Sequence, residues 1–449
     1  MSPVTNALNS VGRAFGSFHP AAVPTLSRGH YRRELTAWLL LPVMMGVVEG
    51  GVVAVIAKNA FAGVVPDNVL NLFVAILSGA PAFANVTSFL WASLSQGRHK
   101  IRFLVTLQIC TAVLVGQVAF APTSAIGLLM LTAGAVGARM CWSGVVTIRT
   151  AVWRANYPRP IRAKLAGKLA TVQAIGLAGV GLAVGAAMRA NPTSYHIIYP
   201  AAAGFGILGA IAYGRMRMRG HAALLAQERA STSRHRRDRL HIWTVLRADA
   251  PFRRYMIAMF VFGIGNLMVT APLVIMLRDV FGFGYLGGII ITVTIPVALM
   301  PFSIPLWARF LDGSHIVRFR TVHSWAFVAA TATFLIAGVT HTPWLLWVAA
   351  SFRGIAFGGG VLGWNLGHHD FAPADRASHY MGAHVTLTGV RGLIGPLLAV
   401  QIYAMLEAWR PGTGPWVFAL CLGLNVIGAL GFLVLLRTMR GSRGAGVDG

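Results

Sequence analysis

The stretch LWASLSQGRHKIRF at residues 90–103 recurs as LWARFLDGSHIVRF at residues 306–319. The shared leucine, tryptophan, alanine, glycine, histidine, arginine and phenylalanine stand 216 positions apart, as the two tryptophans show (307 − 91 = 216). Further pairs match at an offset of 214: Arg139 with Arg353, Tyr157 with Phe371, and Arg162 with Arg376. A repeat this long predicts two like halves, related in a membrane protein by an axis along the membrane normal.

The composition is that of a membrane protein. Mean hydropathy is +0.66, and 11% of the residues are charged, whereas a soluble domain carries about 25%. No residue that is ionised at neutral pH occurs between Arg102 and Arg139, or between Asp279 and Arg309. Such runs exceed the roughly 20 residues that a helix needs to cross a bilayer. The alternating pattern of a membrane barrel is absent, so helices are the expected spanning elements.

We therefore expect an all-α polytopic membrane protein with twelve transmembrane helices in two pseudo-symmetric six-helix bundles. The predicted crossings of the first half are 36–58, 69–93, 102–121, 125–150, 165–188 and 196–214. Those of the second half are 255–277, 284–306, 320–340, 344–366, 382–405 and 414–436. The predicted divisions are an N-terminal segment 1–34, a first bundle 35–214, a basic linker 215–254, a second bundle 255–436 and a tail 437–449.

The positions of the basic residues predict the orientation. A formal charge of +26 in a soluble protein would point to nucleic acid. Here the arginines gather at the N-terminus, after predicted helices 2, 4 and 8, in the linker and on the tail. Positive residues stay on the cytoplasmic side. We expect a multi-pass protein of the inner (plasma) membrane with both termini in the cytoplasm, no nucleic-acid partner, and anionic lipid headgroups near the basic segments.

Two six-helix halves joined by a basic linker resemble the major facilitator superfamily, and the resemblance covers essentially the whole chain. That family carries a Gly-x-x-x-Asp-Arg-x-Gly-Arg-type motif after helices 2 and 8 and a Pro-x-x-Arg element after helices 4 and 10. Here the stretch Gly97 to Lys100 keeps the motif's tail, but leucines replace its first Gly and its Asp. The resemblance implies a cytosolic gate, for which the candidates are Gly97, Arg98, Arg102, Arg162, Asp312, Gly313, Arg318 and Arg376.

Four ionisable residues fall near the predicted middle of the membrane: Glu49, Arg139, Arg353 and Arg391. Each costs about 2.5–3.5 kcal/mol at a helix centre on insertion scales, so such residues pair, line a water-filled cavity or bind a ligand. Helices 1, 4, 7 and 10 line the cavity in the resembling family, which implies that Arg139 and Arg353 face each other there. Three arginines against one glutamate favour a small anionic substrate, because the arginine fork binds carboxylate or phosphate. Asn266 and Asn365 are further candidate cavity contacts.

Glu49 is the candidate for proton coupling. It precedes Gly50-Gly51, where a neighbouring helix can approach closely. We expect it to pair with Arg139 or Arg391 when ionised and to release that arginine when protonated, although a purely structural pair fits the sequence equally. Arg149, near the end of predicted helix 4, is expected to extend its side chain toward the interface.

The sequence thus predicts a secondary active transporter of a small organic anion, working by alternating access and coupled to protons, without a cofactor. The alternatives are a proton-coupled drug or metabolite efflux antiporter, a transport-inactive membrane receptor and a metal-ion carrier. The run His368-His369-Asp370 invites a metal site, but adjacent histidines point to different faces of a helix. No nucleophile, base and orienting group are visible together, so we do not expect an enzyme.

Overall fold

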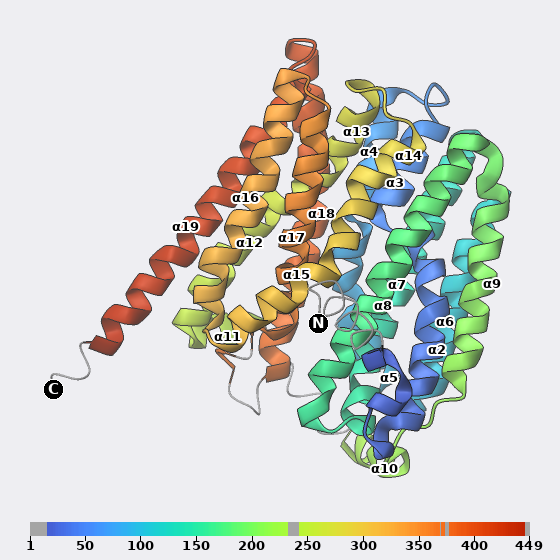
Figure 1. Cartoon of the computed structure of the whole chain (residues 1–449), viewed down its shortest axis with the longest axis vertical. Helices are drawn as coiled ribbons and strands as arrows, with labels where there is room; N and C mark the ends of the chain where they lie inside the picture. Colours follow the sequence, from blue (N-terminus) through green and yellow to red (C-terminus); the bar gives the residue numbers. More distant parts are fainter. Residues whose placement is uncertain (1–15, 232–241, 369, 373–376, 445–449) are drawn as a thin grey trace, which may run out of the picture.

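The computed structural model of the chain describes residues 16–231, 242–368, 370–372 and 377–444. All regular structure in these ranges is helical. Twelve of the described segments are long and apolar enough to cross a membrane, six on each side of the linker. Figure 1 shows them as two bundles standing side by side. The predicted all-α, twelve-helix fold is confirmed.

The first bundle runs from α2 to α9. Its elements are α2 (Thr25–Val47), α3 (Gly50–Ala60), α4 (Asp67–Phe83), η2 (Ala84–Thr87), α5 (Ser88–Ser95), α6 (Lys100–Gly116), α7 (Ala125–Asn156), α8 (Arg159–Ala190) and α9 (Tyr195–Gly214). Segments α2 and α3 together form the first crossing, and α4, η2 and α5 form the second. The short helices α10 (His221–Ser231) and α11 (Ile242–Ala248) flank the undescribed part of the linker.

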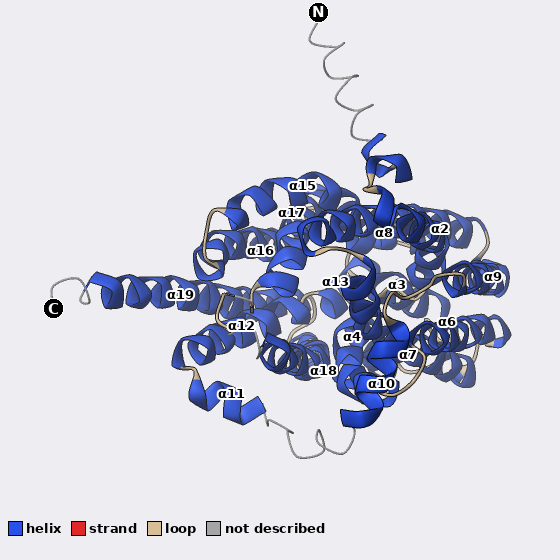
Figure 2. Ribbon diagram, turned by 90° about the horizontal axis from the view of Figure 1, so that it is seen from below, coloured by secondary structure: helices blue, strands red, loops and turns tan. Residues whose placement is uncertain are grey.

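The second bundle repeats this plan. Its elements are α12 (Ala250–Met268), α13 (Thr270–Asp279), α14 (Tyr285–Ile289), the π-helical turn η5 (Ile290–Thr294), α15 (Ile295–Asp312), α16 (Ile316–Thr340), α17 (Trp344–Leu366), α18 (Ala377–Trp409) and α19 (Val417–Gly444). Segments α12 and α13 form the seventh crossing, and α14, η5 and α15 form the eighth. In Figure 2, which looks along the bundles, α13 and α3 lie toward the centre of the molecule.

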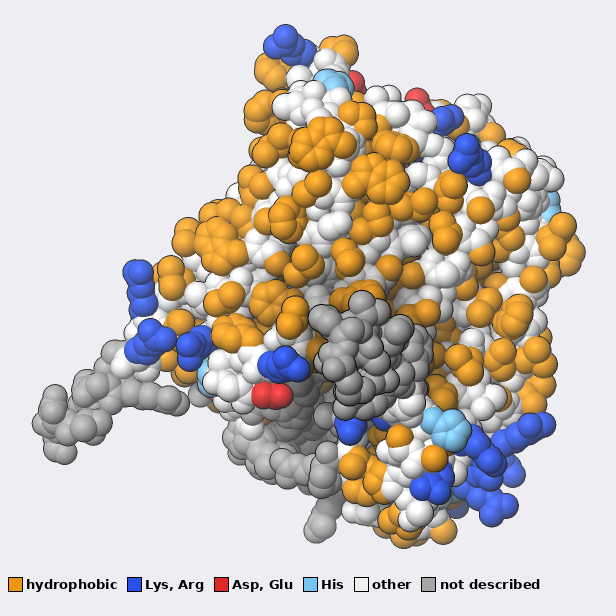
Figure 3. All heavy atoms as spheres, in the orientation of Figure 1, with side chains coloured by type: hydrophobic (Ala, Val, Ile, Leu, Met, Phe, Trp, Pro, Cys, Tyr) orange, Lys and Arg blue, Asp and Glu red, His pale blue; other side chains and the backbone are white. Residues whose placement is uncertain are grey.

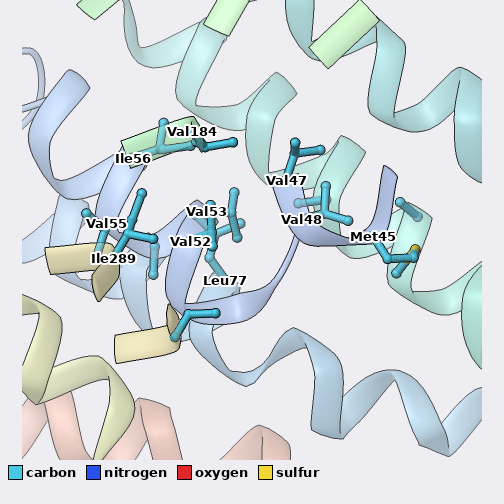
Figure 4. Packing of buried hydrophobic residues seen from close by; sticks show 14 of the residues in the cluster. Met45, Val47, Val48, Val52, Val53, Val55, Ile56, Leu77, Val184 and Ile289 are labelled. Carbon is cyan, nitrogen blue, oxygen red and sulfur yellow. The ribbon is translucent and has the colours of Figure 1, made fainter. Parts of the chain in front are cut away.

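The first crossing differs from its prediction. Its helix begins at Thr25 instead of residue 36, and it is broken between Val47 and Gly50. Three glycines and two valines surround Glu49 in the sequence GVVEGG at 46–51, and both residue types favour the helix poorly. Glu49 itself is extended, with φ −63° and ψ 134°. Figure 4 shows the buried apolar side chains that pack around this break.

The tryptophans of the repeat hold equivalent helices together. Trp91 donates its indole N–H to the carbonyl of Met140 at 2.8 Å, and Trp307 donates to the carbonyl of Ile355 at the same distance. In each bundle this bond ties the second crossing to the fourth.

The outer surface suits a membrane. In Figure 3 the middle of the visible face is covered by hydrophobic side chains, and most of the visible lysines and arginines lie toward the end that carries α10 and α11. Large apolar residues such as Phe120 (79% exposed) and Phe302 (75% exposed) point outward. We call the end with α10 and α11 the linker end.

The two bundles meet at the opposite end, which we call the closed end. Contacts between bundles join α3 and α4 to α13, α8 to α14, η5 and α15, and α4 to α18. Gly51 lies so close to η5 that a Cβ atom there would come within 2.5 Å of Val293. At the linker end, α5 packs on α7 of its own bundle, and α11 packs on α12 and α18 of its own. The structure therefore has one end held shut by contacts between bundles.

Candidate functional site

The break in the first crossing is the centre of the candidate site. Arg139 on α7 forms an ion pair with Glu49, the residue that precedes α3. The same guanidinium donates from Nε to the carbonyl of Val48 at 2.8 Å and from Nη2 to the carbonyl of Met45 at 3.5 Å. A helix end leaves carbonyls without intrahelical partners. Arg139 therefore satisfies both the carboxylate and the backbone that the break exposes.

The pair is only partly buried and is within reach of water. The Glu49 side chain is 25% exposed and that of Arg139 is 10% exposed. The apolar core of this crossing is 78% buried inside the protein, so the exposed carboxylate does not face lipid on a peripheral helix. A carboxyl group at mid-crossing that water can reach is able to exchange a proton.

The second bundle has a similar arrangement without the acid, at a milder interruption: Val269, between α12 and α13, keeps helical dihedrals (φ −67°, ψ −40°), whereas Glu49 is extended. Arg353 on α17 donates from Nη2 to the hydroxyl of Thr270 at 2.6 Å, and Thr270 begins α13 directly after the break in the seventh crossing. The guanidinium carbon lies 5.1 Å from the centre of the Phe357 ring. Arg353 is 5% exposed, and its Nε and Nη1 have no hydrogen-bond partner among the described residues. No ion pair involves Arg353 in the described ranges.

The other three residues predicted for the substrate site occupy different places in the second bundle. Arg391 on α18 donates to the carbonyl of Met259 on α12, and within the described residues no ion pair joins it to Glu49. Asn365 is exposed and bonds to its own helix. It stands 12 residues after Arg353 (365 − 353 = 12), which is about 18 Å along α17. Asn266 is half-buried near the end of α12, two residues before its last.

A second buried carboxylate was missed by the sequence analysis. Glu34 on α2 is fully buried and accepts hydrogen bonds from the Tyr157 hydroxyl at 2.5 Å and from the Trp153 indole. Arg149 lies near it, 3.8 Å from the centre of the Trp38 ring and 4.4 Å from that of Trp153. The expectation that Arg149 extends to the interface is wrong, because the two indoles enclose its guanidinium within the bundle.

The comparisons with known proteins agree with this architecture. A family model described as Major Facilitator Superfamily matches residues 50–396. This chain belongs to the Major Facilitator Superfamily. No curated protein sequence matches it, but solved transporter structures resemble it over nearly its whole length.

One such structure is a bacterial homologue of the human lysosomal transporter Spinster, inward-facing and occupied, with TM-score 0.64, 15% identity, and coverage of 91% of this chain and 97% of the other. Another is a D-xylose–proton symporter, with TM-score 0.65, 14% identity and coverage of 90% and 96%. A third is the human organic anion transporter MFSD10, with TM-score 0.61, 14% identity and coverage of 91% and 100%. Identities this low establish the shared fold alone.

The superfamily loop after the second crossing binds the linker. The backbone N–H of Gly97 and the ammonium of Lys100 each donate to Glu228 of α10 at 2.8 Å. The rings of His99 and His221 meet with centroids 4.1 Å apart. Burial lowers the pKa of His99, and the positive charges of His221 and Arg102 lower it further. The linker helix α10 is thus docked on the loop instead of being free in solvent.

The other gate candidates divide into two groups. Arg162 binds the backbone at the end of α7. Its Nε and Nη2 donate to the carbonyl of Tyr157, the residue that follows α7, at 3.2 and 2.9 Å. Five candidates in the two repeated loops are exposed and make no hydrogen bond of this kind among the described residues: Arg98, Arg102, Asp312, Gly313 and Arg318. Arg376 lies outside the described residues, as does His369 of the candidate metal run. The described residues contain no group of three or more histidine, cysteine or acidic side chains that could hold a metal.

The closed end contains an ion pair that the sequence analysis also missed. Lys58 of α3 is 2% exposed and donates to Asp279 of α13 at 2.8 Å and to Asn71 of α4 at 2.9 Å. Lys58 and Asp279 belong to different bundles. Their ion pair therefore connects the two halves where they must separate if this end is to open.

An apolar recess of about 590 Å³ lies away from these charges, on the second bundle. It is lined by residues of α15, α16 and α17, among them Leu299, Phe302 and Val322. Because Phe302 and Leu306 are 75% and 65% exposed on the outer surface, the recess faces the membrane and not the site at the breaks.

Proposed function

We propose that this superfamily member is a proton-coupled symporter of a small organic anion in the inner membrane. One observation carries the proposal: repeat-related arginines reach the interruptions of the first and seventh crossings, but among the described residues only Arg139 meets an acid. Arg139 is paired with Glu49, whereas Arg353 is bonded to the neutral Thr270. The site therefore holds two positive charges against one negative charge, and the substrate supplies the second.

The substrate anion binds Arg353 at its unpartnered N–H groups. A carboxylate or phosphate can accept two parallel bonds from one guanidinium, which a single hydroxyl cannot. Two N–H-bearing nitrogens of Arg353 are without partners, and a buried donor left unpaired is costly. An anion that replaces the Thr270 hydroxyl and also contacts Arg139 would accept hydrogen bonds from both arginines, Arg353 and Arg139.

Protonation of Glu49 couples the proton to the anion. A protonated Glu49 no longer neutralises Arg139, so the net charge of the site rises by one and the anion binds more tightly. Linkage is reciprocal, so the bound anion in turn favours the proton on Glu49. Proton and anion then cross together, and the residues involved lie at the breaks where helices 1 and 7 can change their packing.

The conformation is inward-facing in this proposal. The positive-inside pattern favours a cytoplasmic location for the linker end, and the ion pair of Lys58 with Asp279 joins the bundles at the other end. Glu49 then exchanges its proton with the cytoplasm in this state. Outward-facing states require the two bundles to separate at the closed end.

The test is thermal unfolding of the detergent-purified protein with a panel of carboxylates, phosphorylated metabolites and lipophilic cations. A ligand at 100 times its Kd stabilises the native state by about 2.7 kcal/mol. We expect one class of small anion to stabilise the wild type and not Arg353→Gln. Stabilisation by lipophilic cations alone would overturn the anion assignment.

Two matched variants sharpen this test. Thr270→Glu gives Arg353 the acid that Arg139 already has, so it should abolish anion binding while Thr270→Gln retains it. Glu49→Gln mimics the protonated carboxyl and should bind the anion at neutral pH as tightly as the wild type does at low pH. If Glu49→Gln keeps the wild-type pH dependence of binding, Glu49 is not the coupling group.

A further inference from the structure

A second set of buried basic side chains lies within the C-terminal bundle. Arg320 on α16 and Arg391 on α18 are 3% and 5% exposed. His323 and His384 are buried beside them, at 0% and 3% exposure. Arg391 lies within electrostatic range of Arg320, and His384 lies within range of both. We call these four residues, together with Tyr255 of α12, the basic pocket.

The basic pocket satisfies only part of its hydrogen bonding. Arg391 donates from Nη2 to the Thr388 hydroxyl at 2.8 Å and from Nη1 to a backbone carbonyl, and Nη1 of Arg320 lies 3.3 Å from Nδ1 of His323. Four buried polar atoms of the pocket have no partner in the part of the chain that the structure describes: Nε of Arg320, Nε of Arg391, Nε2 of His384 and the hydroxyl oxygen of Tyr255. Within the ranges that the structure describes, neither arginine forms an ion pair.

The N-terminal bundle has an acid at the corresponding place. The helices before the two breaks end at Val47 and Met268, an offset of 221 (268 − 47 = 221). The same offset places Tyr255 at the position of Glu34 (255 − 34 = 221). Their surroundings agree: Glu34 bonds to Tyr157, and Tyr255 packs against Phe371, the repeat partner of Tyr157, with ring centroids 5.1 Å apart.

The second bundle has a positive charge at the place that corresponds to Arg149, although it lacks the acid that corresponds to Glu34. The repeat offset of 214 places Gly363 at the position of Arg149 (363 − 149 = 214). The Arg320 guanidinium fills the space that this glycine leaves, since a Cβ at Gly363 would lie 2.6 Å from its Nη2. A cation from another helix thus replaces Arg149, and Arg391 adds a further cation. Among the described residues no carboxylate pairs with either arginine in place of Glu34.

We propose that the basic pocket binds one small anion of the size of chloride, taken from solution, which supplies the negative charge that Glu34 supplies in the other bundle. Buried charges are stable in proteins when they are paired. The near-complete burial of the four basic side chains favours a compact, dehydrated ion over a larger organic one. The anion stabilises the second bundle and is separate from the transported substrate at Arg353.

The first test compares thermal unfolding of the detergent-purified full-length protein in sodium chloride and in sodium gluconate at equal ionic strength. We expect a saturable rise of Tm with chloride that Tyr255→Glu abolishes, because this variant restores the internal acid. Tyr255→Gln is the matched neutral control and should keep the chloride dependence. An equal chloride response in Tyr255→Glu and Tyr255→Gln would overturn the proposal.

Two further measurements keep the proposal testable if a variant does not fold. Crystals of the wild type grown in bromide should show an anomalous peak beside Arg320 and Arg391, and its absence would refute the site. Asp375 lies outside the described residues, and Asp375→Asn should leave the chloride dependence unchanged if the partner is an ion and not this carboxylate. Arg353→Gln should also leave it unchanged, so this proposal and the proposed function can fail separately.

Discussion

Replacing Asp279 with asparagine should favour the conformation in which the two bundles separate at the closed end. Asp279 is the partner, in the second bundle, of the buried Lys58 ammonium, at 2.8 Å. Asparagine keeps the size and can still accept a hydrogen bond, but it removes the charge. Lys58 retains its bond to Asn71 of its own bundle at 2.9 Å, so the variant removes the electrostatic link between bundles with little change within either.

The size of the shift follows from the burial of the pair. Truncating one partner of a buried charge pair costs about 2–5 kcal/mol. The Asp279 side chain is 43% exposed, whereas that of Lys58 is 2% exposed. Solvent screening of the exposed carboxylate reduces the expected loss to about 1–2 kcal/mol. Since 1.4 kcal/mol is a factor of ten, the ratio of closed to open molecules should fall roughly 5- to 30-fold.

The assay is a distance distribution from pulsed electron paramagnetic resonance. Spin labels at Asn68 and Arg410, both exposed and in different bundles, report the separation of the closed end on a cysteine-free background. We expect a longer-distance population to grow in Asp279→Asn. Asp67 is exposed and has no ion pair among the described residues, so Asp67→Asn is the matched control. Identical distributions for wild type and Asp279→Asn would refute the gate assignment.

Three further outcomes are expected. Glu34→Ala leaves the buried Arg149 without its acid and should lower the free energy of unfolding by about 3–5 kcal/mol, with Glu34→Gln milder in the same denaturation assay. Burial and the charge of His221 lower the pKa of His99, so the docked linker binds fewer protons than the released one. Docking of α10 is then strongest above about pH 6.5 and weakens below it. Hydrogen exchange should show this as lower protection factors in α10 at acid pH, each taken relative to the intrinsic exchange rate at that pH. Trp307→Phe removes one hydrogen bond between α15 and α17 and should cost about 1 kcal/mol of stability, whereas an unchanged Tm would show that the bond is not needed.

The fold could be predicted because it depends on local features of the sequence. Charge-free runs longer than a bilayer crossing identify helices without reference to their partners. The repeat around Trp91 and Trp307 identifies the two halves, and both indoles make the same kind of bond in the structure. The pairing of Glu49 with Arg139 was also among the expected alternatives, because so few charges are available near the middle of the membrane.

The residues missed are those near the ends of the apolar runs. Hydropathy marks the lipid-facing core of a crossing, and it assigned Glu34, Lys58 and Arg320 to segments outside or at the edge of the membrane. The structure buries all three inside or between the bundles, at 0%, 2% and 3% exposure. Which face of a helix meets another bundle depends on long-range packing, which one sequence does not reveal. The same reason explains why Asn365 was grouped with Arg353 although it lies about three turns away on α17.

We propose that an anion and a proton cross together, the proton on Glu49 and the anion at Arg353. The most direct measurement follows external pH around proteoliposomes, with no imposed pH gradient, after adding the anion that thermal unfolding identifies. Wild-type protein should make the outside more alkaline as protons enter with the anion, while Glu49→Gln should exchange labelled anion without moving protons. Anion entry through Glu49→Gln with an undiminished pH change would contradict the account.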